Sequence, residues 1–272
     1  QTCVAQGAVV ANRTEVVSLL HDEKGKVAGV VAKDLLTGKE YTVKAKAVIN
    51  AAGGFVDEVL QMDKPGEAKM VVPSQGVHIV LDMKVVQSDY AIMVPKTSDG
   101  RVLFAVPWHD KVVVGTTDIQ RPTAESEPRP LDEEIDFILS TASLYMDPAP
   151  TRKDIVSVFA GQRPLAAPKK EGKSSKEVSR SHKIIVSDHD LITITGGKWT
   201  SYRRMAEDTI DKAIALGKIS KRKCVTRKLK VHGWRPNPDL TDHMYVYGSD
   251  EPLIRDMIKQ NPALGEKLSE KY

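Results

Sequence analysis

Residues 191–203 read Leu191-Ile-Thr-Ile-Thr-Gly-Gly-Lys-Trp-Thr-Ser-Tyr-Arg203 and place a strand, a glycine pair and a helix in immediate succession. Alternating β-branched residues from 191 to 195 indicate the strand. The helix is indicated by apolar residues at helical spacing before the closing Gly217, namely Trp199, Tyr202, Ala206, Ile210, Ala213 and Ile214. A helix that begins directly after a strand presents free N–H groups and a positive dipole end, which suits an anion or an electron-rich ring. A plain strand-to-helix turn explains the same pattern equally well.

A second glycine pair follows another apolar segment near the start of the chain. Residues 45–52 predict a buried strand that runs into Gly53 and Gly54, where a ligand or another backbone can approach closely. Before it, three short strands are predicted at 8–10, 16–21 and 27–33, separated by turns at 22–25 and 37–39.

The middle of the chain is also rich in strands. Strands are predicted at 77–81 and 154–160, with hairpins over 101–116 and 183–195 and a helix over 131–146. The tail is basic at 218–230 and helical over about its last 25 residues. The fold class is therefore mixed α and β (α+β), with antiparallel strands prominent. No G-x-G-x-x-G dinucleotide motif occurs in these residues.

Composition limits the possible classes of protein. The chain has 272 residues, 41% of them hydrophobic, which is enough for a sizeable core, and its formal net charge is +4. The two cysteines, Cys3 and Cys224, predict neither a disulfide framework nor a Cys-rich metal site, and no metal site is predicted. No apolar stretch is long enough to span a bilayer, and no signal peptide is expected. Because the chain begins at Gln1 in a strand-like pattern and ends in a helical one, we expect both ends to be cuts within a longer protein.

Three side chains are candidates for chemistry, and each has a structural alternative. His78 lies in the middle of a predicted strand, where most histidines are structural. Arg163 follows a buried strand and Arg180 precedes one, and either could form a surface ion pair instead. The segment 115–118 could be a simple turn. The cations at 218–230 have no aromatic residues between them for base stacking, so nucleic-acid binding is not expected and a solvated surface is favoured.

Taken together, six segments in the same order resemble one family. They are Asn50-Ala-Ala-Gly53, Pro73-Ser-Gln-Gly-Val-His-Ile-Val80, Gly115-Thr-Thr-Asp118, Gly161-Gln-Arg-Pro-Leu165, Ser179-Arg180 and Thr195-Gly-Gly-Lys-Trp-Thr-Ser-Tyr-Arg203. This set is similar to the motifs of flavin-dependent glycerol-3-phosphate dehydrogenases and oxidases. The resemblance covers residues 1–217, and the tail resembles the family's helical C-terminal domain more weakly.

The sequence departs from the family pattern at several points. Gln75 stands where a basic residue is usual, so the local charge near His78 is expected to differ. Gly54 stands where the family usually has proline. The N-terminal nucleotide motif and an arginine-containing segment of the pocket are not found in these residues.

The resemblance implies a division into four parts. Residues 1–68 would be the remainder of an FAD-binding domain, and 69–195 an antiparallel substrate-binding sheet with the helix 131–146. Residues 196–217 would form a helix that returns to the FAD domain, and 218–272 would begin a helical C-terminal domain.

The resemblance also implies a reaction, the oxidation of sn-glycerol 3-phosphate to dihydroxyacetone phosphate, with hydride passing to flavin N5 and electrons to quinone or, in the oxidase branch, to oxygen. Arg163 and Arg180 would bind the phosphate, because guanidinium groups are permanently charged forks. His78 would be the base. Lys198 would act with it by stabilising the reduced flavin or the substrate oxygen, and Thr200 would add a hydrogen bond. The expected cofactor contacts are Ala51, Ala52, Gly53, Gly196, Gly197 and Lys198.

The expected partners are glycerol 3-phosphate, a quinone and the surface of a membrane, with a cytoplasmic location on the inner face of the cell membrane and a possible homodimer. The chain alone is expected to hold no FAD and to be inactive. Two alternatives remain open. One is a flavoenzyme of the same fold that acts on an amino or hydroxy acid, and the other is a non-catalytic unit that binds a partner or membrane through the 218–230 cations.

Overall fold

The computed structural model describes residues 1–95, 97–98, 100–167 and 181–268. Its internal contacts define two compact units, one of residues 15–221 and one that combines 1–14 with 222–272. Within the described ranges, no helix has the length and apolar character needed to cross a membrane.

The first sheet of the larger unit is an antiparallel meander in the order β1-β2-β3. Its strands are β1 (Thr14–His21), β2 (Val27–Asp34) and β3 (Glu40–Lys44). Asp22 forms the first turn, because its Oδ1 accepts hydrogen bonds from the backbone N–H groups of Lys24 and Lys26 at 2.9 and 2.8 Å. This arrangement confirms the predicted strands at 16–21 and 27–33 and the turn between them.

The second sheet brings together two segments that are far apart in the sequence. β11 (Lys183–Val186) pairs with β12 (Ile192–Thr195), and β12 runs parallel to β4 (Ile49–Asn50). The predicted strand over 45–52 is therefore wrong except at two residues. Its early end is explained by Asn50, whose Nδ2 donates to Val56 O at 2.9 Å while its Oδ1 accepts from Ala52 N at 3.3 Å. These bonds turn the chain into η1 (Gly53–Phe55) and α2 (Val56–Asp63), which were not predicted.

The helix predicted after Gly196 and Gly197 is present but begins late. A short 3₁₀ turn, η4 (Trp199–Ser201), comes first, and α5 (Tyr202–Ala215) follows. Gly217 closes the helix with φ +69°, and its N–H donates to Ile214 O at 2.9 Å.

The third sheet has six strands in the order β10-β5-β8-β7-β6, with β9 also paired to β5. Its strands are β5 (Val71–Asp82), β6 (Ile92–Val94), β7 (Leu103–Trp108), β8 (Lys111–Gly115), β9 (Ile119–Gln120) and β10 (Ile155–Ala166). The accompanying helices are α3 (Met83–Val86), α4 (Asp132–Ala142) and η2 (Arg152–Asp154). The predicted hairpin over 101–116 and the helix in 131–146 are confirmed. β11 and β12, which the sequence analysis placed in this sheet, belong instead to the second sheet, because β12 pairs with β4 and β11 pairs with β12. The boundaries of the four-part division stay a prediction.

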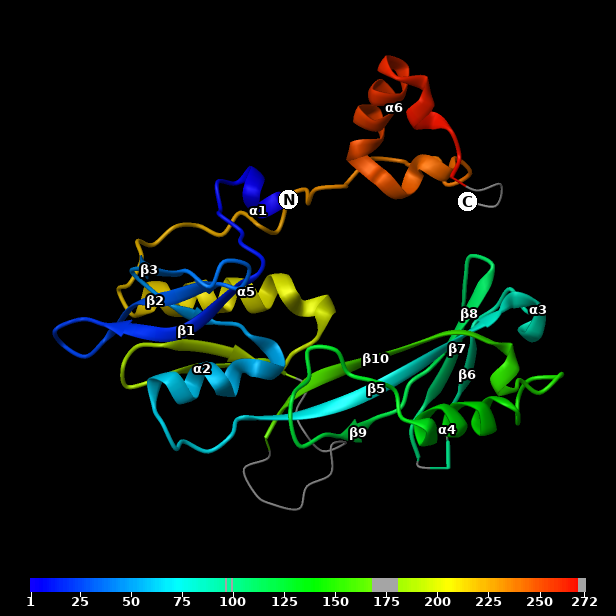
Figure 1. Cartoon of the computed structure of the whole chain (residues 1–272), viewed down its shortest axis with the longest axis horizontal. Helices are drawn as coiled ribbons and strands as arrows, with labels where there is room; N and C mark the ends of the chain where they lie inside the picture. The colour runs from blue at the N-terminus through cyan, green and yellow to red at the C-terminus, as the bar shows by residue number, and fades with distance from the viewer. Residues whose placement is uncertain (96, 99, 168–180, 269–272) are drawn as a thin grey trace. The chain divides into compact units, whose positions relative to one another are not determined.

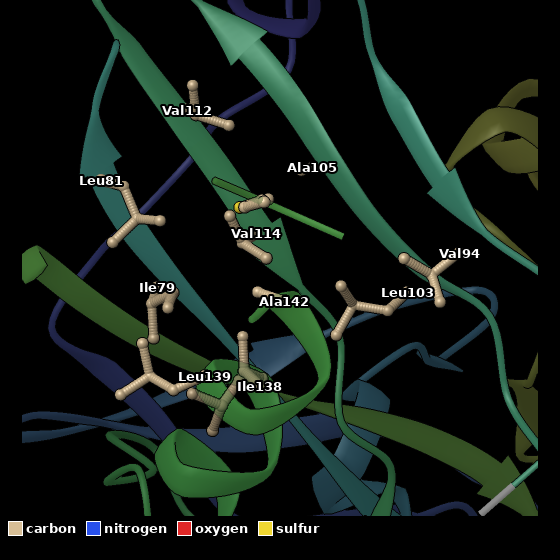
Figure 2. Packing of buried hydrophobic residues seen from close by; sticks show 12 residues of the cluster. Ile79, Leu81, Val94, Leu103, Ala105, Val112, Val114, Ile138, Leu139 and Ala142 are labelled. Carbon is tan, nitrogen blue, oxygen red and sulfur yellow. The ribbon is translucent and has the colours of Figure 1, made fainter. Parts of the chain in front are cut away.

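The core of this sheet lies on the face covered by α4 (Figure 1). Alternate residues of β5, namely Val77, Ile79 and Leu81, are fully buried and belong to one cluster with Ile138 of α4. Figure 2 shows the side chains of Ile79, Leu81 and Ile138 in the same cluster as Leu103 of β7 and Val112 and Val114 of β8. The other face carries Phe104, Val106 and Phe159, whose exposed fractions are 45, 40 and 49%. One face of the sheet is therefore a packed core and the other is an open apolar surface.

The smaller unit combines irregular chain with short helices, most of which lie near the end of the chain as predicted. It contains α1 (Thr2–Ala5), η5 (His243–Asp250), α6 (Glu251–Gln260) and η6 (Pro262–Gly265). The start of the chain contacts the segment around residue 232, where Thr2 Oγ1 accepts a hydrogen bond from His232 N at 2.7 Å. The strand predicted at 8–10 is wrong, because these residues have no strand partner within the described ranges. The described basic residues of 218–230 lie in turns and irregular chain.

Candidate functional site

The open face of the six-stranded sheet carries His78 at its centre. In the register of the sheet, His78 of β5 lies opposite Gly115 of β8 on one side and Phe159 of β10 on the other. The imidazole stacks on the Phe159 ring, with centroids 5.1 Å apart and an interplanar angle of 13°. The strand therefore gives His78 a fixed orientation on the open face, while its neighbours Val77 and Ile79 point into the core.

Gly115 makes room for the His78 ring. A Cβ atom at position 115 would lie 2.5 Å from His78 Cδ2 and 2.8 Å from Val77 O. Both distances are far shorter than ordinary contacts. The glycine of the Gly115-Thr-Thr-Asp118 segment is thus required by the approach of β8 to His78, and the segment is more than a surface turn.

Arg163 lies on the same face as His78. Its strand partner is Ser74, four residues before His78 in β5, and its guanidinium group extends over Gly76. A Cβ atom at Gly76 would lie 2.6 Å from Nη1 and 2.7 Å from Nη2 of this group. Arg163 Nη2 donates to Thr116 Oγ1 at 3.2 Å, and Nη1 lies 3.5 Å from Thr117 O. The predicted pair His78 and Arg163 is therefore brought together.

The surroundings of His78 favour its neutral form. Burial of the ring is the larger cause that lowers the pKa of His78 below its ordinary value, and the charge of Arg163 lowers it further. An imidazole with a lowered pKa is neutral at neutral pH and can accept a proton. The open face thus presents a proton acceptor beside a fixed cation.

A buried polar network supports the site from the core side of β5. The Glu134 carboxylate of α4, 1% exposed, accepts from Thr117 Oγ1 at 2.6 Å and from Gln75 Nε2 at 2.7 Å. Thr117 Oγ1 also accepts from Val77 N at 2.9 Å. Gln75 and His78 are three residues apart in one strand, so they face opposite sides of the sheet. The departure from the family at Gln75 therefore acts on Glu134, in the core, rather than on the charge beside His78.

The two glycine turns expected to contact a cofactor lie at one edge of the second sheet. β4 and β12 are parallel neighbours, with Thr193 paired to Asn50. Each strand is followed directly by a glycine turn at its carboxyl end, where ligands of open α/β sheets bind. Ala51, Ala52, Gly53 with φ +59°, Gly196 and Gly197 are all in these turns.

The second turn can be formed only by glycines. Gly196 and Gly197 have φ values of +74° and +79°. A Cβ at Gly196 would lie 2.9 Å from Ser181 O, and one at Gly197 would lie 2.6 Å from Met205 Sδ. Thr195 Oγ1, just before this turn, is buried and has no hydrogen-bond partner among the described residues. A buried hydroxyl without a partner beside such a turn fits the position of a polar ligand group, so these residues fit the expected flavin.

Lys198 and Thr200 follow this turn and are exposed. The backbone N–H of Lys198 donates to Ser201 Oγ at 3.2 Å, which closes the turn before α5. Within the part of the chain that the structure describes, no hydrogen bond, ion pair or ring contact joins Lys198 or Thr200 to His78 or Arg163. Arg180 lies outside the described residues, so its predicted convergence with Arg163 stays a prediction.

Three contributors to the site were not found from the sequence. Thr116 was quoted only as part of a motif, and its hydroxyl orients Arg163. Phe159 stacks on His78, which only the register between β5 and β10 reveals. Glu134 looked like an ordinary acidic residue in the first turn of a helix. The position of Glu134 was a usable signal, because a capping carboxylate is expected three residues after the residue that precedes a helix. In the structure, Leu131 N donates to Glu134 Oε2 at 3.1 Å.

The chain is similar in sequence to glycerol-3-phosphate dehydrogenases. The mitochondrial glycerol-3-phosphate dehydrogenase SDP6 of Arabidopsis thaliana is 42% identical over 241 residues, which cover 87% of this chain and 38% of that protein. A probable mitochondrial glycerol-3-phosphate dehydrogenase of Dictyostelium discoideum is 36% identical over 302 residues, covering 100% of this chain and 47% of that protein.

Solved structures extend the likeness to the fold. The glycerol-3-phosphate dehydrogenase of Bacillus halodurans, solved in complex with FAD, superposes with a TM-score of 0.75 at 34% identity, covering 97% of this chain and 49% of that one. The glycine oxidase of Geobacillus kaustophilus shares the fold, with a TM-score of 0.53 at 15% identity over 84% of this chain and 55% of that one. The chain spans 38 to 49% of the length of the three glycerol-3-phosphate dehydrogenases.

A family profile gives the broadest match. The profile described as FAD dependent oxidoreductase, DAO, matches residues 1–203 of the 272. The mixed α and β fold with antiparallel sheets agrees with it, as the sequence analysis predicted. The chain therefore belongs to the DAO family of FAD-dependent oxidoreductases.

Proposed function

We propose that this chain is the substrate-binding part, with a portion of the cofactor-binding part, of an FAD-dependent glycerol-3-phosphate dehydrogenase. The reaction is the oxidation of sn-glycerol 3-phosphate to dihydroxyacetone phosphate. One observation carries the proposal: a His78 ring with a lowered pKa lies beside the oriented guanidinium of Arg163 on an open apolar sheet face. The names of the similar dehydrogenases point to the same substrate.

Each residue has a distinct part in this proposal. Arg163 binds the phosphate, because its fork is preorganised by Thr116 and Thr117 and pays little entropy on binding a dianion. Neutral His78 accepts the proton of the substrate hydroxyl at an imidazole nitrogen. A bound FAD would supply the acceptor for the hydride from C2. Phe159 keeps the His78 ring in place during this proton transfer.

The cofactor is proposed to lie at the edge formed by the two glycine turns. Ala51, Ala52 and Gly53 follow β4, while Gly196 and Gly197 follow β12, so both turns can approach one planar ring. Lys198 is proposed as the cation near the ring or the substrate oxygen, with Thr200 as a further donor. Since no G-x-G-x-x-G occurs in these residues, we expect the isolated chain to retain no FAD and to be inactive, which an absorbance spectrum would test.

The remaining proposals concern the second phosphate ligand and the partners of the enzyme. Arg180 is proposed to complete the phosphate site with Arg163. A quinone acceptor, attachment to a membrane surface and a homodimer are all proposed from the family resemblance. The mitochondrial names of the similar eukaryotic proteins favour a mitochondrial membrane surface over the cytoplasmic face of the cell membrane.

A substrate of the amino-acid or hydroxy-acid class is the alternative, since glycine oxidase shares the fold. The test is a titration of the 272-residue chain with glycerol 3-phosphate, lactate and glycine, followed by the NMR signals of the His78 ring. We expect only glycerol 3-phosphate to shift these signals, and Arg163→Gln to abolish the shift. A stronger response to glycine or lactate would refute the proposed substrate.

The proton-transfer role needs the complete enzyme. There, His78→Gln is expected to lower kcat far more than it raises KM, because proton removal belongs to the transition state. An effect on KM alone would make His78 a binding residue.

A further inference from the structure

Outside the proposed active site, three potential metal ligands from distant segments meet in the larger unit. His21 ends β1, Asp63 ends α2, and His189 lies in the turn between β11 and β12. One ligand atom from each residue lies within 4.8 Å of the other two. The separation is 3.0 Å from His189 Nδ1 to Asp63 Oδ1 and 3.6 Å from His21 Nε2 to the same oxygen.

The carboxylate of Asp63 is incompletely satisfied in this arrangement. Its side chain is 1% exposed, and its Oδ2 is buried with no hydrogen-bond partner among the described residues. A buried carboxylate oxygen without a partner is costly. Both histidines approach only Oδ1, so hydrogen bonding by the imidazoles leaves the second oxygen uncompensated. A bound cation would compensate the whole carboxylate group.

The geometry is close to that of a metal site. Ligand atoms at about 2.0–2.1 Å from a tetrahedral metal ion are about 3.3 Å apart, midway between the two separations from Asp63 Oδ1, while the ligand atoms of the two histidines lie within 4.8 Å of each other. The imidazole rings are nearly perpendicular, at 87°, with centroids 5.6 Å apart, so the rings are not stacked and their nitrogens can converge on one ion. The histidine side chains are 35% and 42% exposed, which gives an ion access from solvent.

We propose that His21, Asp63 and His189 bind one divalent transition-metal ion of the zinc class, with water in the fourth position. Two imidazoles and one carboxylate suit zinc among the divalent ions. The site links the meander, α2 and the β11–β12 turn, which also surround the buried cluster of Leu19, Val27, Leu60 and Leu191. The ion therefore acts as a structural clip that fastens the meander to the sheet from which the second glycine turn emerges.

The backbone next to the site is already prepared for this clip. Val27 N, at the start of β2, donates to His189 O at 2.7 Å, and Lys26 Nζ donates to Asp188 O at 2.7 Å. These bonds hold the turn against the meander, so the ion would have to order only side chains. A site whose backbone is prearranged loses little entropy on binding.

The test is titration of the metal-free 272-residue chain with Zn²⁺ by calorimetry. The background carries Cys3→Ser and Cys224→Ser, so that the two thiols cannot bind the ion. We expect one ion per chain, a higher Tm with Zn²⁺, and visible absorption of a four-coordinate site with Co²⁺. His21→Gln and His189→Gln should each weaken Zn²⁺ binding by at least about tenfold.

The matched control is His232→Gln, because His232 forms a histidine–carboxylate pair with Asp250 at 2.8 Å that has no third potential ligand among the described residues. It should leave Zn²⁺ binding unchanged. Circular dichroism of the metal-free variants checks that the histidine substitutions leave the fold intact. Asp63 is not substituted, because it is buried and its loss could unfold the chain. Absence of saturable Zn²⁺ binding, or an affinity in both histidine variants as high as that of the chain with His21 and His189 intact, would overturn the proposal.

Discussion

Replacing Gly115 by alanine tests whether the approach of β8 to His78 is as close as the structure has it. The new Cβ would lie 2.5 Å from His78 Cδ2 and 2.8 Å from Val77 O. Carbon atoms in contact are normally about 3.5–4.0 Å apart, so the overlap is about 1 Å. The backbone of Val77 cannot retreat, because β5 is held by β8 on one side and β10 on the other. The ring of His78 cannot turn freely either, since it stacks on Phe159.

Overpacking of this kind costs about 1–3 kcal/mol. In a unit of this size each kcal/mol lowers Tm by about 2–4 °C. We therefore expect Gly115→Ala to lower the midpoint of urea unfolding and the Tm, and to shift the NMR signals of the His78 ring. Circular dichroism follows the unfolding.

Gly161→Ala is the matched control in the same sheet. Gly161 of β10 pairs with Gly76 of β5, and a Cβ atom at position 161 would meet nothing within 4 Å. Because alanine is favoured over glycine inside a strand by about 0.5–1 kcal/mol, this variant should be unchanged or slightly more stable. Equal loss of stability in the two variants, or none in Gly115→Ala, would refute the reasoning.

Gly76→Ala should weaken glycerol 3-phosphate binding about tenfold or more in calorimetry, because the new Cβ would lie 2.6 Å from both Arg163 Nη1 and Thr116 Oγ1 and would displace the guanidinium together with the hydroxyl that orients it. A charge-assisted hydrogen bond contributes about 1.5–3 kcal/mol, and unchanged affinity would contradict this role. Arg163→Gln should raise the pKa of His78 in an NMR titration, yet leave it below the ordinary value, because burial is the larger cause of the lowered pKa. Because the pKa of His78 is lower in the folded chain than in the unfolded chain, the free energy of unfolding should fall as pH drops below the ordinary histidine pKa. This fall should be smaller in Arg163→Gln. Glu134→Ala should lower the free energy of unfolding by about 1–3 kcal/mol for each buried donor left unpaired, of which Thr117 is one, and a neutral result in urea would show the network to be dispensable.

Local patterns predicted much of the fold because many elements here obey local chemistry. Asp22 with Gly25 predicted the first turn, and the alternation around Ile79 predicted the central strand of the largest sheet. Asn50 defeated the same reasoning. Its neighbours read as a continuing strand, but its side chain bonds to backbone groups that come later in the chain and ends the strand. Such side-chain competition with the ladder has no signature in hydrophobic periodicity.

The sequence predicted the site residues that belong to motifs, but not the contacts that depend on the register between strands. His78 and Arg163 were chosen from the sequence, and the pairing of β5 with β10 brings them onto one face. The stacking of Phe159 on His78 follows from that register alone. The cluster of His21, Asp63 and His189 could not be foreseen, because it depends on α2, a helix that the sequence analysis missed.

The parallel pairing of β4 with β12 has a consequence for how this architecture can change. The whole six-stranded sheet, from Val71 to Ala166, lies in the sequence between these two neighbouring strands. It is therefore a cassette, a continuous segment inserted between β4 and the β11–β12 hairpin of the sheet to which all three strands belong. A cassette of this kind can be exchanged or remodelled without altering the register of β4 and β12. A chimaera that joins these strands to the corresponding sheet of another family member should therefore keep the glycine edge while acquiring a different substrate preference.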